Sequence, residues 1–390
     1  MSQKENKIAI IPLRAGSKGI VNKNRKKIFG RPLFAWVLTE AIQSKLDQVY
    51  VFTDDTVIKS YIEKEYTWTN KVTVVERSAE SASDTASTEA GMVELAEKLD
   101  YQFSHYFLLQ ATSPLTTAAD IDKCIDTLKK EGVDSVLTAV KTHRFIWNSK
   151  GESLNYDYLN RPRRQDFEGL IIENGAVYGC TAETFKNTNN RLGGNIQVVE
   201  MEEDTLTEID EPADLIIIEQ LLKKRLLQSK KPLGSIRYLV LDVDGVFTDA
   251  TVSYTQDGEF SKNFSFVDGM GLEVLRDNSI EPIIMTSENS DLVKKRMEKL
   301  QIKRCYLGVK DKYALLNSIL PELGVLRNQI AYLGDDINDL SNILSVGWGA
   351  CPINATGQVA NNADIKLSAN GGKGAIRELV EFLISFNKRI

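Results

Sequence analysis

Residues 236–249 read IRYLVLDVDGVFTD. A mostly apolar run, Ile236–Leu241, is followed by two aspartates, Asp242 and Asp244, that are separated by one residue. The run Ile236–Leu241 has the length and the Leu, Ile and Val content of a buried strand. Asp242 and Asp244 follow it, and because alternate residues share one side of an extended chain, their carboxylates face the same way. Ligands of parallel α/β sheets bind beyond the carboxyl ends of strands, so this stretch predicts a reactive carboxylate pair at a strand tip.

Two carboxylates in this arrangement suit phosphoryl transfer. One attacks phosphorus while the other protonates the leaving oxygen and then activates water, and Mg²⁺ offsets their mutual repulsion. The alternative from these residues alone is a calcium-binding or turn-forming aspartate loop. Downstream, apolar runs precede Thr286-Ser287 and the acidic stretch Asp335–Asp339, and a cation stands at Lys312 or, as a less favoured alternative, Lys310. The C-terminal part of the chain is therefore predicted to hold a magnesium site suited to phosphoryl transfer.

A second group of charged residues follows the first predicted strand of the chain. Lys7–Ile11 runs into the loop Pro12–Gly19, which reads PLRAGSKG. Its glycines let the backbone approach a phosphate, and Arg14 and Lys18 supply positive potential. The loop matches neither a Walker A sequence nor a Rossmann fingerprint. It predicts a cradle for phosphate, the alternative being a surface turn with solvated lysines.

Strand-like and helix-like segments alternate along most of the chain. Gln48–Phe52 and His105–Leu109 read as strands, and Leu33–Ser44 and Thr88–Leu99 as helices. Such alternation predicts an α/β protein with mostly parallel sheets covered by helices. The alternation pauses at the polar, Arg- and Tyr-rich stretch Thr142–Gly169, which is interpreted as an inserted subdomain or an interface arm.

The length of 390 residues suits two domains. The segment Gln228–Gly234 (QSKKPLG) is charged and contains Pro and Gly, as linkers do. The predicted domains are residues 1–228 and 236–390, joined by a linker at 229–235.

Composition excludes several classes of protein. The net charge of −6 argues against a general nucleic-acid binder. No run approaches ~18 apolar residues, so neither a membrane span nor a secretory leader is expected, and the expected location is the cytoplasm. The four cysteines form no CxxC and are expected to be free thiols, and two histidines argue against a His-rich zinc site.

Five ordered motifs over about residues 7–225 resemble the CMP-sialic acid synthetases, the N-acylneuraminate cytidylyltransferase family. They are Ile11–Asn24 (IPLRAGSKGIVNKN), Arg77 with Ser83–Ala86 (SDTA), Leu109–Leu115 (LQATSPL), Arg161–Asp166 (RPRRQD) and Glu173–Tyr178 (ENGAVY). The resemblance implies that a sugar's anomeric hydroxyl attacks the α-phosphate of CTP and releases pyrophosphate. Such chemistry needs cations around a crowded anionic centre more than it needs a covalent protein group.

The same resemblance implies roles for individual residues. Arg14 and Lys18 would be catalytic cations, and the nucleotide contacts would come from Lys23, Asn24, Arg77 and Ser83. The sugar acid would meet Gln110, Arg164, Gln165, Asn174 and Gly175. Asp210 and Glu208 would bind Mg²⁺, with more weight on Asp210, because the family usually carries Asp where Glu208 stands. From the residues alone, the alternatives are a solvated charged loop for Arg161–Arg164 and a helix cap for Asp210.

Residues 236–390 resemble the haloacid dehalogenase phosphatases. The spacing from Asp249 to Thr286 is too short for a large cap domain, and Asp257–Phe266 reads as a small β-hairpin instead. Asp268–Gly271 (DGMG) and Gly371–Arg377 (GGKGAIR) match the capless, tetrameric subgroup that acts on 3-deoxy-octulosonate 8-phosphate or on nine-carbon ketodeoxy sugar acid phosphates. Together the two resemblances imply two Rossmann-like domains. The first has the mixed sheet of nucleotide-diphospho-sugar transferases, and the second a haloacid dehalogenase-like parallel sheet without a large cap.

The phosphatase resemblance also implies roles for residues. Asp242 would be the nucleophile and Asp244 the acid/base. Thr286 and Lys312 would hold the phosphate. Mg²⁺ would bind Asp242, Asp244 and Asp335, supported by Asp336 or Asp339. The remaining substrate contacts would be Asp268, Ser287, Glu288 and Lys299.

One pattern favours a nine-carbon substrate. Ser287-Glu288, with Lys299 on the following helix, resembles the nononate 9-phosphate phosphatases, whereas the octulosonate enzymes usually carry Arg where Glu288 stands. The alternative for Glu288 and Lys299 is an ordinary pair on a helix surface.

Both resemblances point to a 3-deoxy-2-keto sugar acid. The resulting hypothesis is a homotetrameric bifunctional enzyme. Its partners are CTP, a nonulosonic acid (sialic acid or KDN) and the 9-phosphate of that acid. The competing hypotheses are a CMP-KDO synthetase with KDO 8-phosphate phosphatase activity, a synthetase whose C-terminal domain only assembles oligomers, and a sugar-acid sensor without turnover.

Overall fold

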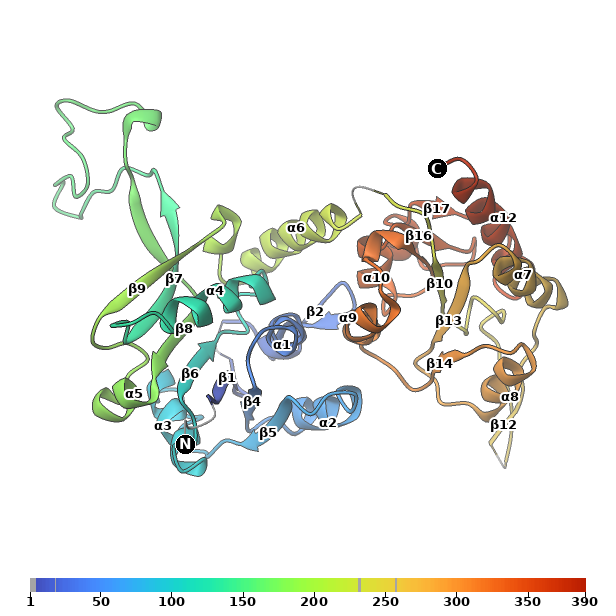
Figure 1. The fold of residues 1–390 in the computed structure, drawn as a ribbon, viewed down its shortest axis with the longest axis horizontal. Coiled ribbons are helices and arrows are strands. Elements are labelled where there is room, and N and C mark those ends of the chain that lie inside the picture. The colour runs from blue at the N-terminus through green and yellow to red at the C-terminus, as the bar shows by residue number, and fades with distance from the viewer. Residues whose placement is uncertain (1–4, 18, 231–232, 257) are drawn as a thin grey trace. The chain divides into compact units, whose positions relative to one another are not determined.

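The computed structural model describes residues 5–17, 19–230, 233–256 and 258–390. It divides into two compact units, the first comprising Met1–Lys26 and Pro32–Leu221 and the second Lys27–Arg31 and Leu222–Ile390. The expected α/β architecture with two Rossmann-like domains is confirmed (Figure 1). The proposed linker at 229–235 includes residues 231 and 232, which lie outside the described residues.

The first unit is built on a seven-stranded mixed sheet of order β5-β4-β1-β6-β8-β7-β9. In that order the strands are β5 (Val72–Glu76), β4 (Gln48–Thr53), β1 (Lys7–Leu13), β6 (His105–Leu109), β8 (Leu170–Thr181), β7 (Ser135–Thr142) and β9 (Ile196–Met201). The four strands β5 to β6 are parallel, β8 is antiparallel to both of its neighbours, and β9 is parallel to β7. The parallel part aligns the carboxyl ends of β1, β4 and β6, which is where ligands of such sheets bind.

Helices accompany this sheet, and side-chain caps fix where several of them begin. The helices are α1 (Leu33–Gln43), α2 (Thr56–Glu65), α3 (Thr88–Lys98), α4 (Ala118–Leu128), α5 (Ala182–Thr188) and α6 (Pro212–Gln228), with 3₁₀ helices η1 (Lys23–Arg25), η2 (Arg164–Asp166) and η3 (Glu203–Leu206). Asp55 caps α2, Ser87 caps α3, and Thr117 forms a capping box with Asp120 on α4. These side chains satisfy backbone N–H groups that have no partner within the helix.

The segment between β7 and β8 projects away from the sheet (Figure 1). Aromatic rings organise it: the Phe145 ring centroid lies 4.2 Å from that of Tyr156 and 4.9 Å from that of Phe167. The guanidinium of Arg161 lies 4.3 Å from the centroid of the Phe145 ring. This segment, residues 143–169, is called the arm below.

The second unit contains a six-stranded sheet of order β14-β13-β10-β15-β16-β17, whose neighbouring strands are all parallel. Its strands are β14 (Arg304–Tyr306), β13 (Glu281–Met285), β10 (Tyr238–Leu241), β15 (Ile330–Leu333), β16 (Trp348–Cys351) and β17 (Ile365–Lys366). Since β10 lies between β13 and β15, the residues that follow these three strands meet at one edge of the sheet.

Helices and a small hairpin complete this unit. They are α7 (Phe266–Asp277), α8 (Asp291–Lys299), α9 (Lys312–Leu323), η4 (Arg327–Gln329), α10 (Leu340–Ser345), α11 (Gly357–Ala360), α12 (Ala375–Asn387), and the antiparallel strands β11 (Ser253–Thr255) and β12 (Gly258–Ser261). The hairpin thus begins before the predicted Asp257–Phe266, and residue 257 itself lies outside the described residues. Phe266 instead opens α7, because the Ser265 side chain accepts a hydrogen bond from the N–H of Asp268 and caps that helix.

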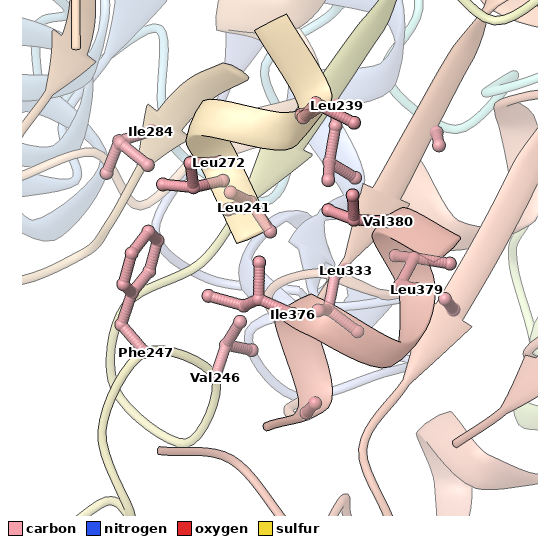
Figure 2. Close-up of a cluster of buried hydrophobic side chains, with 14 of the residues drawn as sticks. Leu239, Leu241, Val246, Phe247, Leu272, Ile284, Leu333, Ile376, Leu379 and Val380 are labelled. Atoms are coloured by element: carbon pink, nitrogen blue, oxygen red, sulfur yellow. The ribbon is translucent and has the colours of Figure 1, made fainter. Parts of the chain in front are cut away.

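A buried apolar cluster holds the loop after β10 in place (Figure 2). Leu272 of α7 and Ile376 of α12 pack together with Val246 and Phe247, which belong to the DVDGVF stretch. Each fully buried side chain of this kind contributes about 1.5–3 kcal/mol. The apolar residues of the motif therefore anchor the aspartates that precede them.

Two expectations from composition concern features of the whole chain. The four cysteines are free, as predicted. Within the described ranges, no helix has both the length and the apolar character needed to cross a lipid bilayer.

Candidate active sites

The first candidate site is a cleft of about 390 Å³ at the carboxyl end of β1. Most of the residues predicted to bind nucleotide or metal line it, namely Arg14, Lys23, Asn24, Arg77, Ser83 and Asp210. Gln110, predicted to meet the sugar acid, lines it too. Lys18, also predicted here, lies outside the described residues. The sequence-derived cradle is thus a single cleft that draws on segments far apart in the chain.

Two cations of this cleft, Arg14 and Lys23, are paired with acids that are themselves open to solvent. Arg14 Nη1 lies 2.8 Å from Asp84 Oδ1, and Lys23 Nζ lies 3.1 Å from Asp210 Oδ1. The side chains of Asp84 and Asp210 are 54% and 72% exposed. Exposed ion pairs contribute only about 0–1 kcal/mol. A polyphosphate can therefore replace these acids as the partner of the cations at little cost.

A hydrogen-bonded turn fixes the position of Arg77. Its guanidinium is buried, which lowers its pKa, and it donates to the carbonyl of Ser81. Glu94 accepts hydrogen bonds from the N–H and the hydroxyl of Ser78 and from the hydroxyl of Ser81. Burial alone would raise the pKa of Glu94, but the hydrogen bonds from Lys98, Ser81 and Ser78 lower it to about 2. The Glu94 carboxylate thus holds the turn that positions a guanidinium in the cleft.

Three further predicted residues do not line this cleft. Asn174 is buried, and its Nδ2 donates to Thr205 Oγ1 at 3.0 Å. Gly175 has φ +68, a conformation that favours glycine, and a Cβ there would lie 1.5 Å from Glu208 Oε1, so a larger residue would displace this carboxylate. Burial, followed by repulsion from Asp210, raises the pKa of Glu208. The predicted metal ligand Glu208 therefore packs against Gly175, whereas Asp210 faces the cleft.

The predicted sugar-binding residues of the arm lie in a different cleft. Arg164 and Gln165 line a cavity of about 700 Å³ together with Lys141, His143 and Glu200. Gln110, by contrast, lines the cleft at the carboxyl end of β1, which is called the nucleotide cleft below after its predicted ligand. The structure thus separates residues that the sequence motifs place at one substrate.

The second candidate site is a cluster of carboxylates around a buried lysine, in which Asp242 and Asp339 are buried and Asp335 is partly buried. One oxygen from each of Asp242, Asp335 and Asp339 lies within 4.8 Å of the others. Lys312 Nζ lies 2.8 Å from Asp242 Oδ2 and 2.7 Å from Asp339 Oδ1, and its side chain is fully buried. Tyr332 donates its hydroxyl to Asp339 Oδ1 at 2.7 Å. Asp242 follows β10 and Asp335 follows β15, so the parallel pairing of these strands brings the acids together.

The electrostatics of this cluster follow from burial and crowding. Burial and repulsion from Asp339 raise the pKa of Asp242 well above its ordinary range, and the same two causes raise the pKa of Asp335 to about 7. Burial would lower the pKa of Lys312, but Asp242 and Asp339 raise it. Asp335 Oδ1 is buried and has no hydrogen-bond partner among the described residues. Such a set of hard oxygen donors fits a divalent cation such as Mg²⁺.

The predicted acid/base Asp244 is held by a lysine that sequence reasoning missed. Lys262 Nζ lies 2.8 Å and 3.1 Å from the two carboxylate oxygens of Asp244, and only 3% of the lysine side chain is exposed. Lys262 follows strand β12 of the hairpin. The only signal in the sequence was its place beside the hairpin that replaces a cap, because the pairing depends on how the hairpin folds back.

Three other predicted residues, Thr286, Ser287 and Asp336, lie in the loops that follow β13 and β15. Thr286 is buried directly after β13, and Ser287 Oγ accepts a hydrogen bond from Asn338 Nδ2 at 2.8 Å. Asp336 is exposed and accepts from the N–H of Ile337, so the acid that completes the cluster is Asp339.

The three remaining predicted substrate contacts are two exposed side chains and one fully buried one. Glu288 and Lys299 are both exposed. Asp268 is fully buried and accepts from the N–H groups of Gly374 and Arg377, each at 3.1 Å. In this chain Asp268 therefore fastens the glycine-rich tail to α7.

Comparison with known proteins finds relatives of both parts of the chain. The sequence profile of the family described as Cytidylyltransferase matches residues 8–233. An N-acylneuraminate cytidylyltransferase of Oncorhynchus mykiss is 32% identical over 400 residues, which cover 99% of this chain and 90% of that protein. N-acylneuraminate cytidylyltransferase B of Danio rerio is 28% identical over 98% of this chain and 92% of that protein.

A second kind of relative matches a smaller part of the chain. A 3-deoxy-D-manno-octulosonate 8-phosphate phosphatase of Haemophilus influenzae is 34% identical over 155 residues, which cover 40% of this chain and 86% of that protein. The chain therefore belongs to the N-acylneuraminate cytidylyltransferase family and carries a fused domain of the haloacid dehalogenase phosphatase type.

Proposed function

We propose that the protein is a bifunctional enzyme acting on one sugar acid. Its first unit transfers CMP from CTP to the anomeric hydroxyl of a nonulosonic acid, sialic acid or KDN, and releases pyrophosphate. Its second unit hydrolyses the 9-phosphate of the same acid. The observation that carries the proposal is the buried contact of Lys312 with both Asp242 and Asp339, which holds a nucleophile, a cation and a metal-binding acid together.

In the transferase reaction the protein acts by charge and position. The anomeric oxygen bonds to the α-phosphorus while the bond to pyrophosphate breaks, so negative charge grows on the leaving group. Arg14 and Lys23 line the cleft where this charge would develop. Asp210 would hold Mg²⁺, which would supply further positive charge at the phosphates.

In the phosphatase reaction a side chain takes part covalently. Asp242 attacks phosphorus, the sugar oxygen leaves, and Asp244 gives that oxygen a proton. Water then hydrolyses the aspartyl phosphate, with Asp244 as the base that accepts its proton. Lys312 offsets the charge that gathers on the phosphoryl oxygens. Asp242, Asp335 and Asp339 would hold Mg²⁺, which would neutralise part of the same charge.

The test is the variant Asp242→Asn, assayed for both reactions. Phosphate release should be lost, while cytidylyl transfer to the free acid should continue. Phosphatase activity that survives, or cytidylyl transfer that is lost in a folded protein, would show that this division of labour is wrong.

The second candidate is the octulosonate pair of reactions, and the similarity to an octulosonate 8-phosphate phosphatase favours it. The substrates would then be KDO with CTP, and KDO 8-phosphate. Assays of both sugar acids with CTP and Mg²⁺, and of both phosphates, decide between the candidates.

A C-terminal domain that serves only assembly would release no phosphate from an aryl phosphate.

We place the domains at residues 1–228 and 236–390 and the assembled enzyme in the cytoplasm as a homotetramer. Large apolar side chains on the surface support assembly: Phe266 and Met270 of α7, and Trp147 and Leu159 of the arm, are exposed. Apolar surface of this kind commonly marks protein interfaces. Light scattering of the purified chain should give four times its mass of 43.7 kDa, and a monomer would contradict the assignment.

A further inference from the structure

The second unit includes a short segment from far upstream in the chain. Residues Lys27–Arg31, which contain β2 (Lys27–Ile28) and the start of β3 (Arg31–Pro32), belong to it by their contacts. Phe29 and Gly30 have φ +48 and +80, and a Cβ on Gly30 would lie 2.0 Å from the carbonyl oxygen of Ile337. The carbonyl of Phe29 accepts a hydrogen bond from the hydroxyl of Ser341. The segment therefore packs tightly on the loop that carries Asp335–Asp339.

Arg31 joins this segment to α9 through a buried ion pair with Asp311. Its Nε lies 2.8 Å from Asp311 Oδ1 and its Nη2 lies 3.0 Å from Asp311 Oδ2, a bidentate pairing. The side chains of Arg31 and Asp311 are 3% and 0% exposed. The guanidinium also lies 4.5 Å from the centroid of the Tyr313 ring. A buried, bidentate and stacked arginine is held in one orientation.

The partner of Arg31 stands next to the lysine of the proposed phosphatase site. Asp311 is the N-cap of α9, and its Oδ1 accepts from the N–H of Ala314 at 3.1 Å. Lys312 is the first residue of that helix and reaches Asp242 and Asp339. The Asp311 carboxylate thus binds the Arg31 guanidinium and also caps the helix whose first residue is Lys312.

Removal of either partner from a buried ion pair leaves an uncompensated charge, which the surrounding structure must relax to accommodate. Here Asp311 also caps the first turn of α9, so a change in its position would disturb the turn that carries Lys312. Small displacements of a group that binds the reacting phosphate lower the rate far more than they lower binding of the rest of the substrate.

We propose that Arg31 is a positioning residue of the phosphatase: through Asp311 it fixes the start of α9, and so holds the Lys312 ammonium between Asp242 and Asp339. This inference rests on the proposed phosphatase function. It assigns part of the phosphatase site to a residue more than two hundred positions upstream of the nucleophile in the sequence.

The test uses the full chain and p-nitrophenyl phosphate with Mg²⁺. Arg31→Ala should lower kcat by about 10- to 100-fold and leave KM within about threefold. Arg31→Lys should fall between the wild type and Arg31→Ala, because an ammonium cannot form the bidentate pair. Millimolar guanidinium chloride should restore part of the kcat of Arg31→Ala. Lys27→Ala is the matched control, because Lys27 lies in the same segment and is exposed.

Each variant is also checked for folding by its thermal unfolding midpoint. A folded Arg31→Ala with wild-type kcat, or a loss that guanidinium does not restore, would overturn the inference. If Arg31→Ala fails to fold, Arg31→Lys decides: unchanged kcat would likewise overturn it. Wild-type protein that releases no phosphate would instead refute the proposed phosphatase function, so the two failures are distinguishable.

Discussion

The two candidate sites hold their charges in opposite ways. In the nucleotide cleft, Arg14 and Asp84 form an ion pair whose side chains are 32% and 54% exposed. In the carboxylate cluster, Lys312 and Asp339 form a pair whose side chains are fully buried. The first arrangement is open to a ligand that replaces the acids, whereas the second is assembled before any substrate arrives.

This difference indicates when the charges of each site contribute to the reaction rate. A cleft with exposed ion pairs gains its full electrostatic effect only when a polyphosphate displaces water and acids. A buried cluster has already met the cost of desolvation during folding, so its charges act at full strength on a bound phosphate. Substitutions should therefore be more damaging in the cluster than in the cleft.

The largest effect should follow the loss of a carboxylate from the cluster. Asp335→Asn should lower phosphatase kcat roughly a thousandfold, because it removes a carboxylate proposed to bind Mg²⁺, a cation that would supply several kcal/mol. The concentration of Mg²⁺ needed for half-maximal rate should rise in the same titration. Asp277→Asn, an exposed acid of α7, is the control and should match the wild type. Equal rates in the two variants would break the comparison.

A smaller effect is expected in the nucleotide cleft. Lys23→Ala should lower kcat/KM for CTP about a hundredfold, since it removes one of several cations around the phosphates. Phosphatase activity of the same variant should stay unchanged. Lys26→Ala, an exposed neighbour, serves as the control. A loss as large as that of Asp335→Asn would show that this cleft is as pre-assembled as the cluster.

The lysine beside the acid/base should matter less than either. Lys262→Met should lower phosphatase kcat about tenfold, because Asp244 keeps its chemistry but loses the contact that orients it. The comparison is with Lys295→Met on the exposed face of α8. No change in kcat would mean that Lys262 only neutralises charge in the resting protein.

The smallest effect concerns stability near the nucleotide cleft. Glu94→Gln should lower the free energy of unfolding at pH 7 by about 1–2 kcal/mol, since hydrogen bonds to the ionised carboxylate are lost. The folded-state pKa of Glu94 is about 2, below its ordinary value of 4.5. This stabilisation is therefore present above pH 4.5 and is lost as the pH falls toward 2. Denaturant unfolding at pH 7 and pH 3 should show the difference from wild type shrinking, whereas Glu97→Gln should differ little at either pH.

The predictions from the sequence agree best with the structure where the predicted site residues directly follow a predicted strand. The apolar run before Asp242 and the runs before Thr286 and Asp335 identify three strands, and their parallel order brings the following residues to one edge. Local pattern is sufficient there, because side-chain alternation and strand direction together determine where the motif points.

Agreement is weaker where position depends on distant parts of the chain. Arg164 and Gln165 belong to the arm, whose course depends on rings such as Phe145 and Tyr156 packing on one another, and they line a separate cleft. The pairings of Lys262 with Asp244 and of Arg31 with Asp311 join segments with no shared motif. Contacts of this kind have no periodic or local signature in the sequence.

The most direct test of the account is a single incubation of a nonulosonate 9-phosphate with CTP and Mg²⁺. Wild-type protein should release inorganic phosphate and then form the CMP-sugar. Asp242→Asn should form neither product from the phosphate, yet form the CMP-sugar from the free acid. Formation of a CMP-sugar from the phosphorylated acid by Asp242→Asn, or no phosphate release by the wild type, would contradict two successive reactions at two separate sites.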